Sequence, residues 1–155
     1  MAVYHTNTEL AGTPQAMAAT YKTLITLTAA TATLTSGKII DVMFGTEGTP
    51  ADNFLEYDIS RQTAAGTITA ATPTALDPTT RACGTVAGVN ATAEGTVTAA
   101  SSVFYIAVNQ RASYRWVAVP GSELIIPNVN LAGFAIRAKS AAYTGNATAS
   151  VYHSE

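Results

Sequence analysis

Charged residues are scarce in this sequence. Lys, Arg, Asp and Glu make up 12% of its 155 residues, and the formal net charge is -2. The basic residues are spread along the chain with acids among them, so no basic patch can be recognised. Because binding to nucleic acid requires clustered Lys and Arg side chains that neutralise phosphates, the sequence predicts no nucleic-acid partner.

Long apolar runs are also missing. No window approaches the roughly 18 consecutive apolar residues that identify a membrane-crossing helix, and the most apolar stretches have the length of a strand. The first residues, Met1–Thr8, lack the basic and apolar regions of a secretory signal. We therefore expect no membrane partner, and a protein that is made in the cytoplasm and used without secretory export.

Side chains that bind metals are few. The one cysteine, Cys83, has no second cysteine for a disulfide within the chain, and we expect it to be a small buried or half-buried residue. His5 and His153 stand at opposite ends of the sequence, so no His/Cys cluster has the spacing of a zinc site. The sequence therefore predicts no metal and no cofactor.

Recognisable catalytic motifs are lacking as well. Neither histidine lies near a Gly-x-Ser-x-Gly elbow, and the Gly-rich motifs that bind phosphates do not occur. The densest carboxylates, Asp52, Glu56 and Asp58, do not follow the calcium-loop pattern, and we expect them to be solvated loop acids. The sequence predicts no catalytic residues and a protein that is not an enzyme.

Alanine and threonine are abundant instead. The chain has 30 Ala and 25 Thr, and all threonines except Thr144 and Thr148 precede Ala99. Thr favours pleated strands, whereas Ala contributes little burial, so the first two thirds should form thin strands and surface loops. The last third carries the bulky side chains and should supply most of the core.

Short strands separated by Pro, Gly and Asn predict an all-β sandwich or barrel. In the last third, the expected strands are Ser102–Asn109, Ser113–Val119, Glu123–Ile126, Gly133–Lys139 and Ala147–His153. Before them, the patterns predict Tyr21–Thr28, Gly37–Phe44, Asn53–Ile59 and Thr67–Ala71. Residues 84–100 fit either an edge strand or a long exposed excursion.

Two of these strands carry more detailed expectations. Alternation places Ile40 on the same face as Val42 and Phe44. The segment Ser102–Asn109 is apolar on both faces, so this strand should be central in its sheet or covered on its second side. Trp116, the only tryptophan, is more typical of a core anchor than of a ligand platform.

The N-terminal segment differs from the rest of the chain. Residues 1–19 contain Gly12 and Pro14 and have no persistent period, which indicates an extended arm. Residues 20–155 then form a single β domain, a size at which a chain can bury a core without disulfides.

Three segments give the sequence a resemblance to a known family. They are Tyr57–Thr67 (YDISRQTAAGT), Asn109–Leu124 (NQRASYRWVAVPGSEL) and Ala135–Gly145 (AIRAKSAAYTG), together with Glu155. Over most of its length the chain resembles small uncharacterised proteins encoded among the structural genes of tailed phages. The resemblance implies a jelly-roll-like β-sandwich that forms a homotrimer. It also implies a capsid decoration (cement) protein that binds the major capsid protein on the outer surface of the virion.

Two kinds of partner remain open at this point. A decoration protein can bind a symmetric lattice through many copies, each with weak contacts, because the contacts add up to a high avidity. The residues from which we expect such contacts are Tyr4, His5, Pro14, Gln15, Arg111 and Tyr114. The alternative is a receptor- or glycan-binding accessory module of a fibre or tail. That alternative is suggested by Tyr105, Tyr114 and Tyr143, which lie in or next to the strand-rich region.

Overall fold

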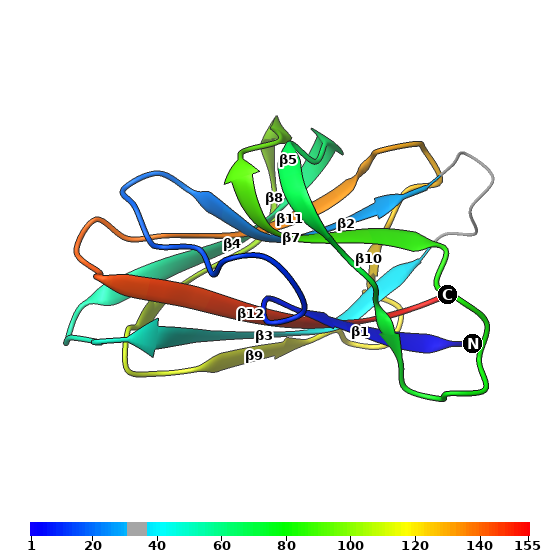
Figure 1. Ribbon diagram of the computed structural model, residues 1–155, viewed down its shortest axis with the longest axis horizontal. Coiled ribbons are helices and arrows are strands. Elements are labelled where there is room, and N and C mark those ends of the chain that lie inside the picture. The colour runs from blue at the N-terminus through cyan, green and yellow to red at the C-terminus, as the bar shows by residue number, and fades with distance from the viewer. Residues whose placement is uncertain (31–36) are drawn as a thin grey trace.

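The computed structural model describes residues 1–30 and 37–155, which fold into two antiparallel sheets packed together (Figure 1). The predicted all-β sandwich is therefore confirmed. The strands are β1 (Val3–Asn7), β2 (Lys22–Ala29), β3 (Lys38–Gly48), β4 (Phe54–Ala64), β5 (Thr67–Ala71), β6 (Thr74–Ala75), β7 (Thr85–Ala93), β8 (Thr96–Asn109), β9 (Tyr114–Val117), β10 (Leu124–Ile125), β11 (Gly133–Lys139) and β12 (Gly145–Ser154).

One sheet, here called sheet A, is built around β12. This strand pairs with β3 from Gly145 opposite Gly48 to Ser154 opposite Lys38. On its other side β12 pairs with β1, and β6 extends the sheet beyond β1. β9 and β10 both pair with β3, so the order is β10-β3-β12-β1-β6 with β9 beside β3.

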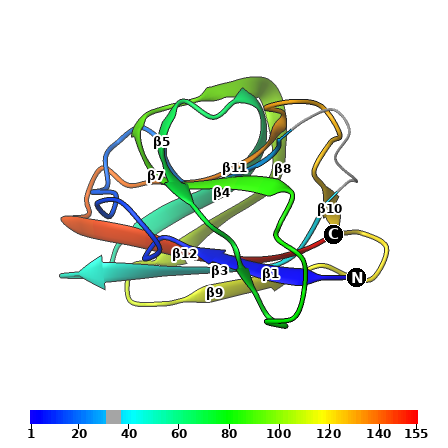
Figure 2. The ribbon, with the colours of Figure 1, turned by 45° about the vertical axis from the view of Figure 1, so that its right-hand side comes forward.

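The second sheet, sheet B, has the order β5-β7-β2-β11-β4-β8. In Figure 2, β5 and the neighbouring ends of β7 and β8 rise above the rest of the sheet as an arch. The segment 84–100, which the sequence left open, thus forms β7 and the first part of β8. The jelly-roll connectivity stays a prediction.

The core lies between the sheets and contains the apolar side chains that alternate along the central strands. Leu24 and Leu27 of β2, Phe134 and Ile136 of β11 and Val151 of β12 are each 0% exposed. Burying one side chain of this kind stabilises the fold by about 1.5–3 kcal/mol relative to leaving it in water. Eleven of the 19 residues of the buried core cluster, from Leu24 to Val89, precede residue 100, so the expectation that the last third supplies most of the core is wrong.

Threonine takes a larger part in the interior than its polarity suggests. Thr6, Thr23, Thr26, Thr28 and Thr85 are all between 0% and 3% exposed. Their β-branched side chains suit pleated strands, and their small volume lets neighbouring strands approach. The expectation that the Thr-rich part of the chain forms only thin strands and surface loops is therefore wrong.

A β-bulge changes the face on which one predicted core residue lies. Tyr152 of β12 is opposite Asp41, but His153 is opposite Ile39, so Ile40 is an extra residue in β3. Ile39 is consequently fully buried, whereas Ile40 is only half-buried. The prediction that Ile40 shares a face with Val42 and Phe44 is wrong because strict alternation does not allow for a bulge.

The N-terminal segment is part of the sandwich rather than a free arm. Residues 3–7 form β1 between β12 and β6, and the side chains of Tyr4 and Thr6 are buried. Beyond β1, the amide of Thr8 donates to the carbonyl of Ala149 (3.1 Å), and that of Met17 donates to Gly145 (3.0 Å). These contacts correct the expectation of an extended arm for the segment.

β8 lies at the edge of sheet B, where its one paired neighbour within the described chain is β4. The prediction of a central or covered strand at Ser102–Asn109 is therefore wrong. Phe104, Ile106 and Val108 face inward and are half-buried, whereas Val103 and Tyr105 are exposed. Both faces of this strand are apolar, yet its outer edge is open.

The first half of β8 is irregular. Ser60 of β4 is opposite Ser102, and Gln62 is opposite Val97, so residues 98–101 bulge out of the ladder. The bulge is closed by a hydrogen bond from Ser101 Oγ to the carbonyl of Thr98 (2.6 Å), and Ala100 has a positive φ of 53°. A further register shift leaves Val103 as an extra residue between Ser102, opposite Ser60, and Phe104, opposite Ile59, so regular pairing in β8 extends only from Phe104 to Asn109.

We expect Ile136→Ala to lower the free energy of unfolding by about 2–5 kcal/mol, because it leaves a cavity between the sheets. Ile125→Ala is the matched control, since Ile125 of β10 is 41% exposed, and it should cost less than about 1 kcal/mol. Urea unfolding followed by circular dichroism measures both changes. Equal losses in the two variants would contradict this description of the core.

Candidate interaction surface

The residues predicted to contact a partner are not all on the surface. Tyr4 is 1% exposed, its hydroxyl donates to the carbonyl of Arg81 (2.9 Å), and its ring stacks on His153 with 5.5 Å between centroids. Burial raises the pKa of the Tyr4 hydroxyl above its usual value. This side chain is not available to a partner in the folded chain, which corrects the expectation for Tyr4.

His5 lies on the outer face of sheet A. Its ring stacks on Tyr152 with 4.6 Å between centroids, and its Nε2 is hydrogen-bonded to Ser150 Oγ. Burial lowers the pKa of this imidazole. Pro14 and Gln15 are half-buried in the connection between β1 and β2. A role of these three residues in contacts stays a prediction.

Arg111 occupies the turn between β8 and β9. Its Nε lies 3.1 Å from Asp52 Oδ1, but both side chains are largely exposed, so the ion pair contributes little to stability. The side chain of Gln110, which is 0% exposed, stabilises this turn from the interior. Gln110 Oε1 accepts from the amide of Ala51 (3.0 Å), and its carbonyl accepts from Thr46 Oγ1 (2.8 Å).

Tyr114 belongs to a row of aromatic rings at this side of the sandwich. Phe104 of β8 lies 5.9 Å from Tyr114, 6.1 Å from Trp116 and 5.8 Å from Phe44, measured between ring centroids. Phe44 is buried, and the other three are half-buried. Trp116 therefore packs against the core, but its face toward solvent is not covered by the residues described.

We call Ser102–Asn109 of β8 and Tyr114–Val117 of β9 the β8–β9 edge. The eight residues Ser102–Asn109 contain no charged residue and no proline, and their outer edge is unpaired within residues 1–30 and 37–155. Tyr105 and Val117 add exposed apolar surface, each at 56%.

The other sheet edges are shorter. β5 has five residues, while β6 and β10 have two each, and β6 lies between Pro73 and Pro78. Short strands and prolines are devices that stop a sheet edge from pairing with another chain. β8 is longer than these strands and contains no proline, whereas β9 has four residues and carries the charged Arg115.

The outer face of sheet B beside β8 carries a closed polar network. Arg137 donates to Asp58 Oδ2 from Nε (3.0 Å) and Nη2 (2.6 Å), and to Ser60 Oγ (3.0 Å). Ser60 and Ser102 each donate a hydroxyl to Asp58 as well. Asp58 is only 3% exposed, so the prediction of a solvated loop acid is wrong for this residue.

The same face continues toward β11 and Tyr21. Lys139 Nζ lies 3.0 Å from Glu56 Oε2, and the Tyr21 ring lies under both cations, 4.8 Å from Lys139 and 4.5 Å from Arg137. Glu56 is therefore a half-buried ion-pair partner rather than a free loop acid. The charges of this face are engaged with one another, which suits a structural role.

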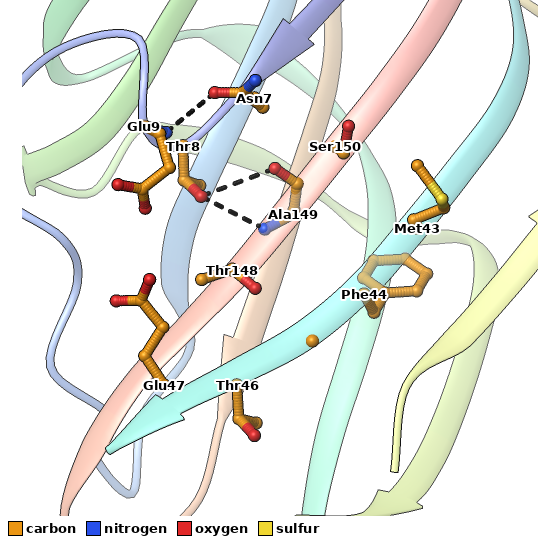
Figure 3. A pocket seen from close by; sticks show the side chains of 11 residues that line it. Asn7, Thr8, Glu9, Met43, Phe44, Thr46, Glu47, Thr148, Ala149 and Ser150 are labelled. Carbon is orange, nitrogen blue, oxygen red and sulfur yellow. Dashed lines mark hydrogen bonds between the residues drawn. The ribbon is translucent and has the colours of Figure 1, made fainter.

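A hollow of about 460 Å³ opens near the end of β1, lined mainly by polar side chains (Figure 3). In Figure 3 the carboxyl ends of Glu9 and Glu47 stand on the same side of it. Its one aromatic residue, Phe44, is 2% exposed. The hollow thus has hydrogen-bonding groups but no exposed ring on which a sugar can stack.

The tyrosines that suggested glycan binding are also separated by the fold. Tyr105 is exposed, Tyr114 is half-buried, and Tyr143 is buried with its hydroxyl bonded to the carbonyl of Glu47. Tyr143 is therefore not available as part of a binding surface.

One cluster of possible metal ligands was missed by sequence reasoning. Cys83, His153 and Glu155 each offer an atom within 4.8 Å of the other two. Burial raises the pKa of the Cys83 thiol to about 12 and lowers that of the His153 imidazole to about 4. The pair is thus a neutral thiol and a neutral imidazole, not an activated thiolate nucleophile.

The signal that could have found this cluster is weak. His153 and Glu155 are two residues apart, which places both side chains on one face of an extended chain. Cys83 joins them from 70 residues away, and no spacing rule reaches that far. Cys83 is half-buried, as predicted.

Comparisons with protein-family models, curated proteins and solved structures found no match for this chain. Within the residues described, no helix is long and apolar enough to cross a membrane.

We expect Gln110→Ala to lower the free energy of unfolding by about 1–3 kcal/mol, because it removes a fully buried side chain that accepts a hydrogen bond from the amide of Ala51. The adjacent exposed variant, Arg111→Ala, should change it by less than about 1 kcal/mol. Urea unfolding compares the two. A larger loss for Arg111→Ala would show that the surface ion pair, and not Gln110, holds the turn.

Proposed function

We propose that this chain is a virion structural protein without enzymatic activity, and specifically a capsid decoration (cement) protein. It is made in the host cytoplasm, binds the major capsid protein on the outer capsid surface as a homotrimer, and stabilises the shell. The observation that carries this proposal is the outer edge of β8 at Ser102–Asn109, which is long and uncharged and is unpaired within residues 1–30 and 37–155. The resemblance to tailed-phage structural proteins supports the same role.

The partner on the β8–β9 edge is a second copy of the chain. An open edge offers a row of backbone donors and acceptors, which a soluble protein normally blunts or covers. Identical chains are always present together, and a closed ring of copies covers the edge of every member equally. Because Tyr105 and Val117 flank this edge, an interface here also removes exposed apolar surface from water.

A different part of the molecule is free for the capsid. Residues 13–17, 48–53 and 110–113 come together at one end of the sandwich, which we call the loop end. Ala16 is bridged to Asn146, Gly145 pairs with Gly48, and Gln110 contacts Ala51. In Figure 1 these turns lie on the left, and both chain ends lie on the right.

The loop end contains three of the predicted contact residues, Pro14, Gln15 and Arg111. Each contact in such a group is weak alone, but three copies held in one trimer bind a symmetric lattice with a much higher effective concentration. Low net charge agrees with a partner recognised by shape rather than by long-range attraction.

The alternative is a receptor- or glycan-binding accessory module of a fibre or tail. The exposed ring of Tyr105 favours it, because exposed aromatic rings provide recognition surfaces. It has less support, because the polar hollow near β1 has no exposed ring and Tyr143 is buried.

The proposed trimer predicts a specific effect of charge on the β8–β9 edge. Val117→Glu should convert the trimer to monomer, because it places an unpaired carboxylate in an apolar interface. Val129→Glu is the matched control, since Val129 is 57% exposed and lies in the loop between β10 and β11. Sedimentation velocity measures the oligomeric state. A monomeric wild-type chain would refute the proposed assembly.

Capsid binding provides a separate test of the loop end. The double variant Gln15→Ala with Arg111→Ala should remain trimeric but bind capsids of the encoding phage at least about tenfold more weakly, because losses repeat in each copy. Lys38→Ala, an exposed cation next to the chain ends, is the control. Co-sedimentation with capsids measures binding. Unchanged binding in the double variant, together with binding to a glycan array, would favour the alternative.

A further inference from the structure

Three side chains with metal-binding atoms meet where the end of β12 lies beside the connection between β6 and β7. Cys83 comes from this connection, while His153 and Glu155 come from the end of β12. The backbone of Glu155 exchanges two hydrogen bonds of 3.0 Å with Ala2, which extends the pairing of β12 with the N-terminal segment. The position of this chain end is therefore fixed on two sides.

We propose that Cys83 Sγ, His153 Nε2 and Glu155 Oε1 bind one Zn²⁺ ion. This site is independent of the β8–β9 edge and of the proposed role on the capsid.

Two of the three distances between these atoms fit a tetrahedral zinc ion. Cys83 Sγ lies 3.3 Å from His153 Nε2 and 3.4 Å from Glu155 Oε1. Zinc bonds of about 2.3 Å to sulfur and about 2.0–2.2 Å to nitrogen or oxygen, at tetrahedral angles, separate such ligand atoms by about 3.5 Å. The two measured edges thus need little adjustment, and the third edge is at most 4.8 Å.

The environment of His153 also favours a role as a metal ligand. Its side chain is 0% exposed, and Nδ1 has no hydrogen-bond partner among residues 1–30 and 37–155. Nε2 meets the sulfur of Cys83, which is a weak hydrogen-bonding group. A zinc bond at Nε2 would replace this weak contact and would leave the imidazole proton on Nδ1, which the metal itself does not satisfy.

Hydrogen bonds to Gly84 and Thr85 hold the Glu155 carboxylate in place beside the other two ligands. Oε1 accepts from the amide and hydroxyl of Thr85 (both 2.6 Å), and Oε2 accepts from the amide of Gly84 (3.0 Å). Arg81 Nη2 lies 3.6 Å from Oε2. Hydrogen bonds of this kind fix ligating carboxylates in metal sites and are worth about 10–100-fold in metal affinity.

A hollow of about 390 Å³ reaches Cys83 and is lined in part by Tyr4 and Arg81, whereas His153 and Glu155 do not line it. It would be the route by which an ion, and a water as fourth ligand, approach the sulfur. On binding, the thiol of Cys83 forms the sulfur–zinc bond and releases its proton to solvent, while the neutral imidazole binds without proton loss.

The ligand set selects zinc over the harder cations. Ca²⁺ and Mg²⁺ take oxygen ligands, whereas a thiolate combined with an imidazole is typical of Zn²⁺. A bound ion would tie β12 to the connection before β7, which no disulfide can do in a chain with one cysteine. The consequence is a metal-dependent clamp on sheet A.

The test uses the full chain, purified with a chelator and then titrated with ZnCl₂ by calorimetry, with Co²⁺ as a spectroscopic substitute. The wild type should bind one zinc per chain, raise its melting temperature, and show a Co²⁺–thiolate charge-transfer band. Cys83→Ala should bind at least about 100-fold more weakly and lose that band. His5→Gln, at the histidine outside the cluster, should behave as the wild type.

Several results would overturn the proposal. These are no zinc binding by the wild type, a Co²⁺ spectrum without the thiolate band, or undiminished binding in Cys83→Ala. Circular dichroism checks that the variants fold. If Cys83→Ala does not fold, the stoichiometry and the Co²⁺ spectrum of the wild-type chain decide the question without it.

Discussion

The pairing of β12 with β3 on one side and β1 on the other is the constraint on which the rest of this structure depends. It joins the last strand of the chain to the first, and it places Ala147, Ala149 and Val151 in the core. Because β1 is held in the sheet by this pairing, the N-terminal segment cannot act as a free arm. The same pairing places His153 and Glu155 next to Cys83, and it brings Gly145 and Gly48 together at the loop end.

Much of the fold was predictable where side chains alternate strongly. The predicted strand Gly133–Lys139 coincides with β11, and Ala147–His153 lies within β12. In these strands the apolar residues recur at every second position, and nothing local competes with that period. The β-sandwich follows from several such strands with short connections.

The errors occur where tertiary structure overrides the local pattern. β1 is a five-residue strand in which Thr6 takes an inward position, so its pattern does not look apolar. The extra residue at Ile40 depends on the register of a strand more than 100 positions later in the sequence. The local sequence also does not determine whether a strand is central or at the edge of its sheet. Ser102–Asn109 has the composition of a central strand, yet it lies at an edge. Sites built from distant residues, such as Cys83 with His153, are beyond any spacing rule.

The bulge at residues 98–101 limits the length of the β-ladder that can form along the outer edge of β8. A strand placed against β8 would find regularly spaced backbone groups only from Phe104 to Asn109, and the displaced residues before them interrupt any longer ladder. An uninterrupted edge of this composition would be a template for continuous growth into fibres. The distortion thus limits the length of the regular edge, and this limit agrees with the proposed small closed assembly rather than with continuous polymerisation.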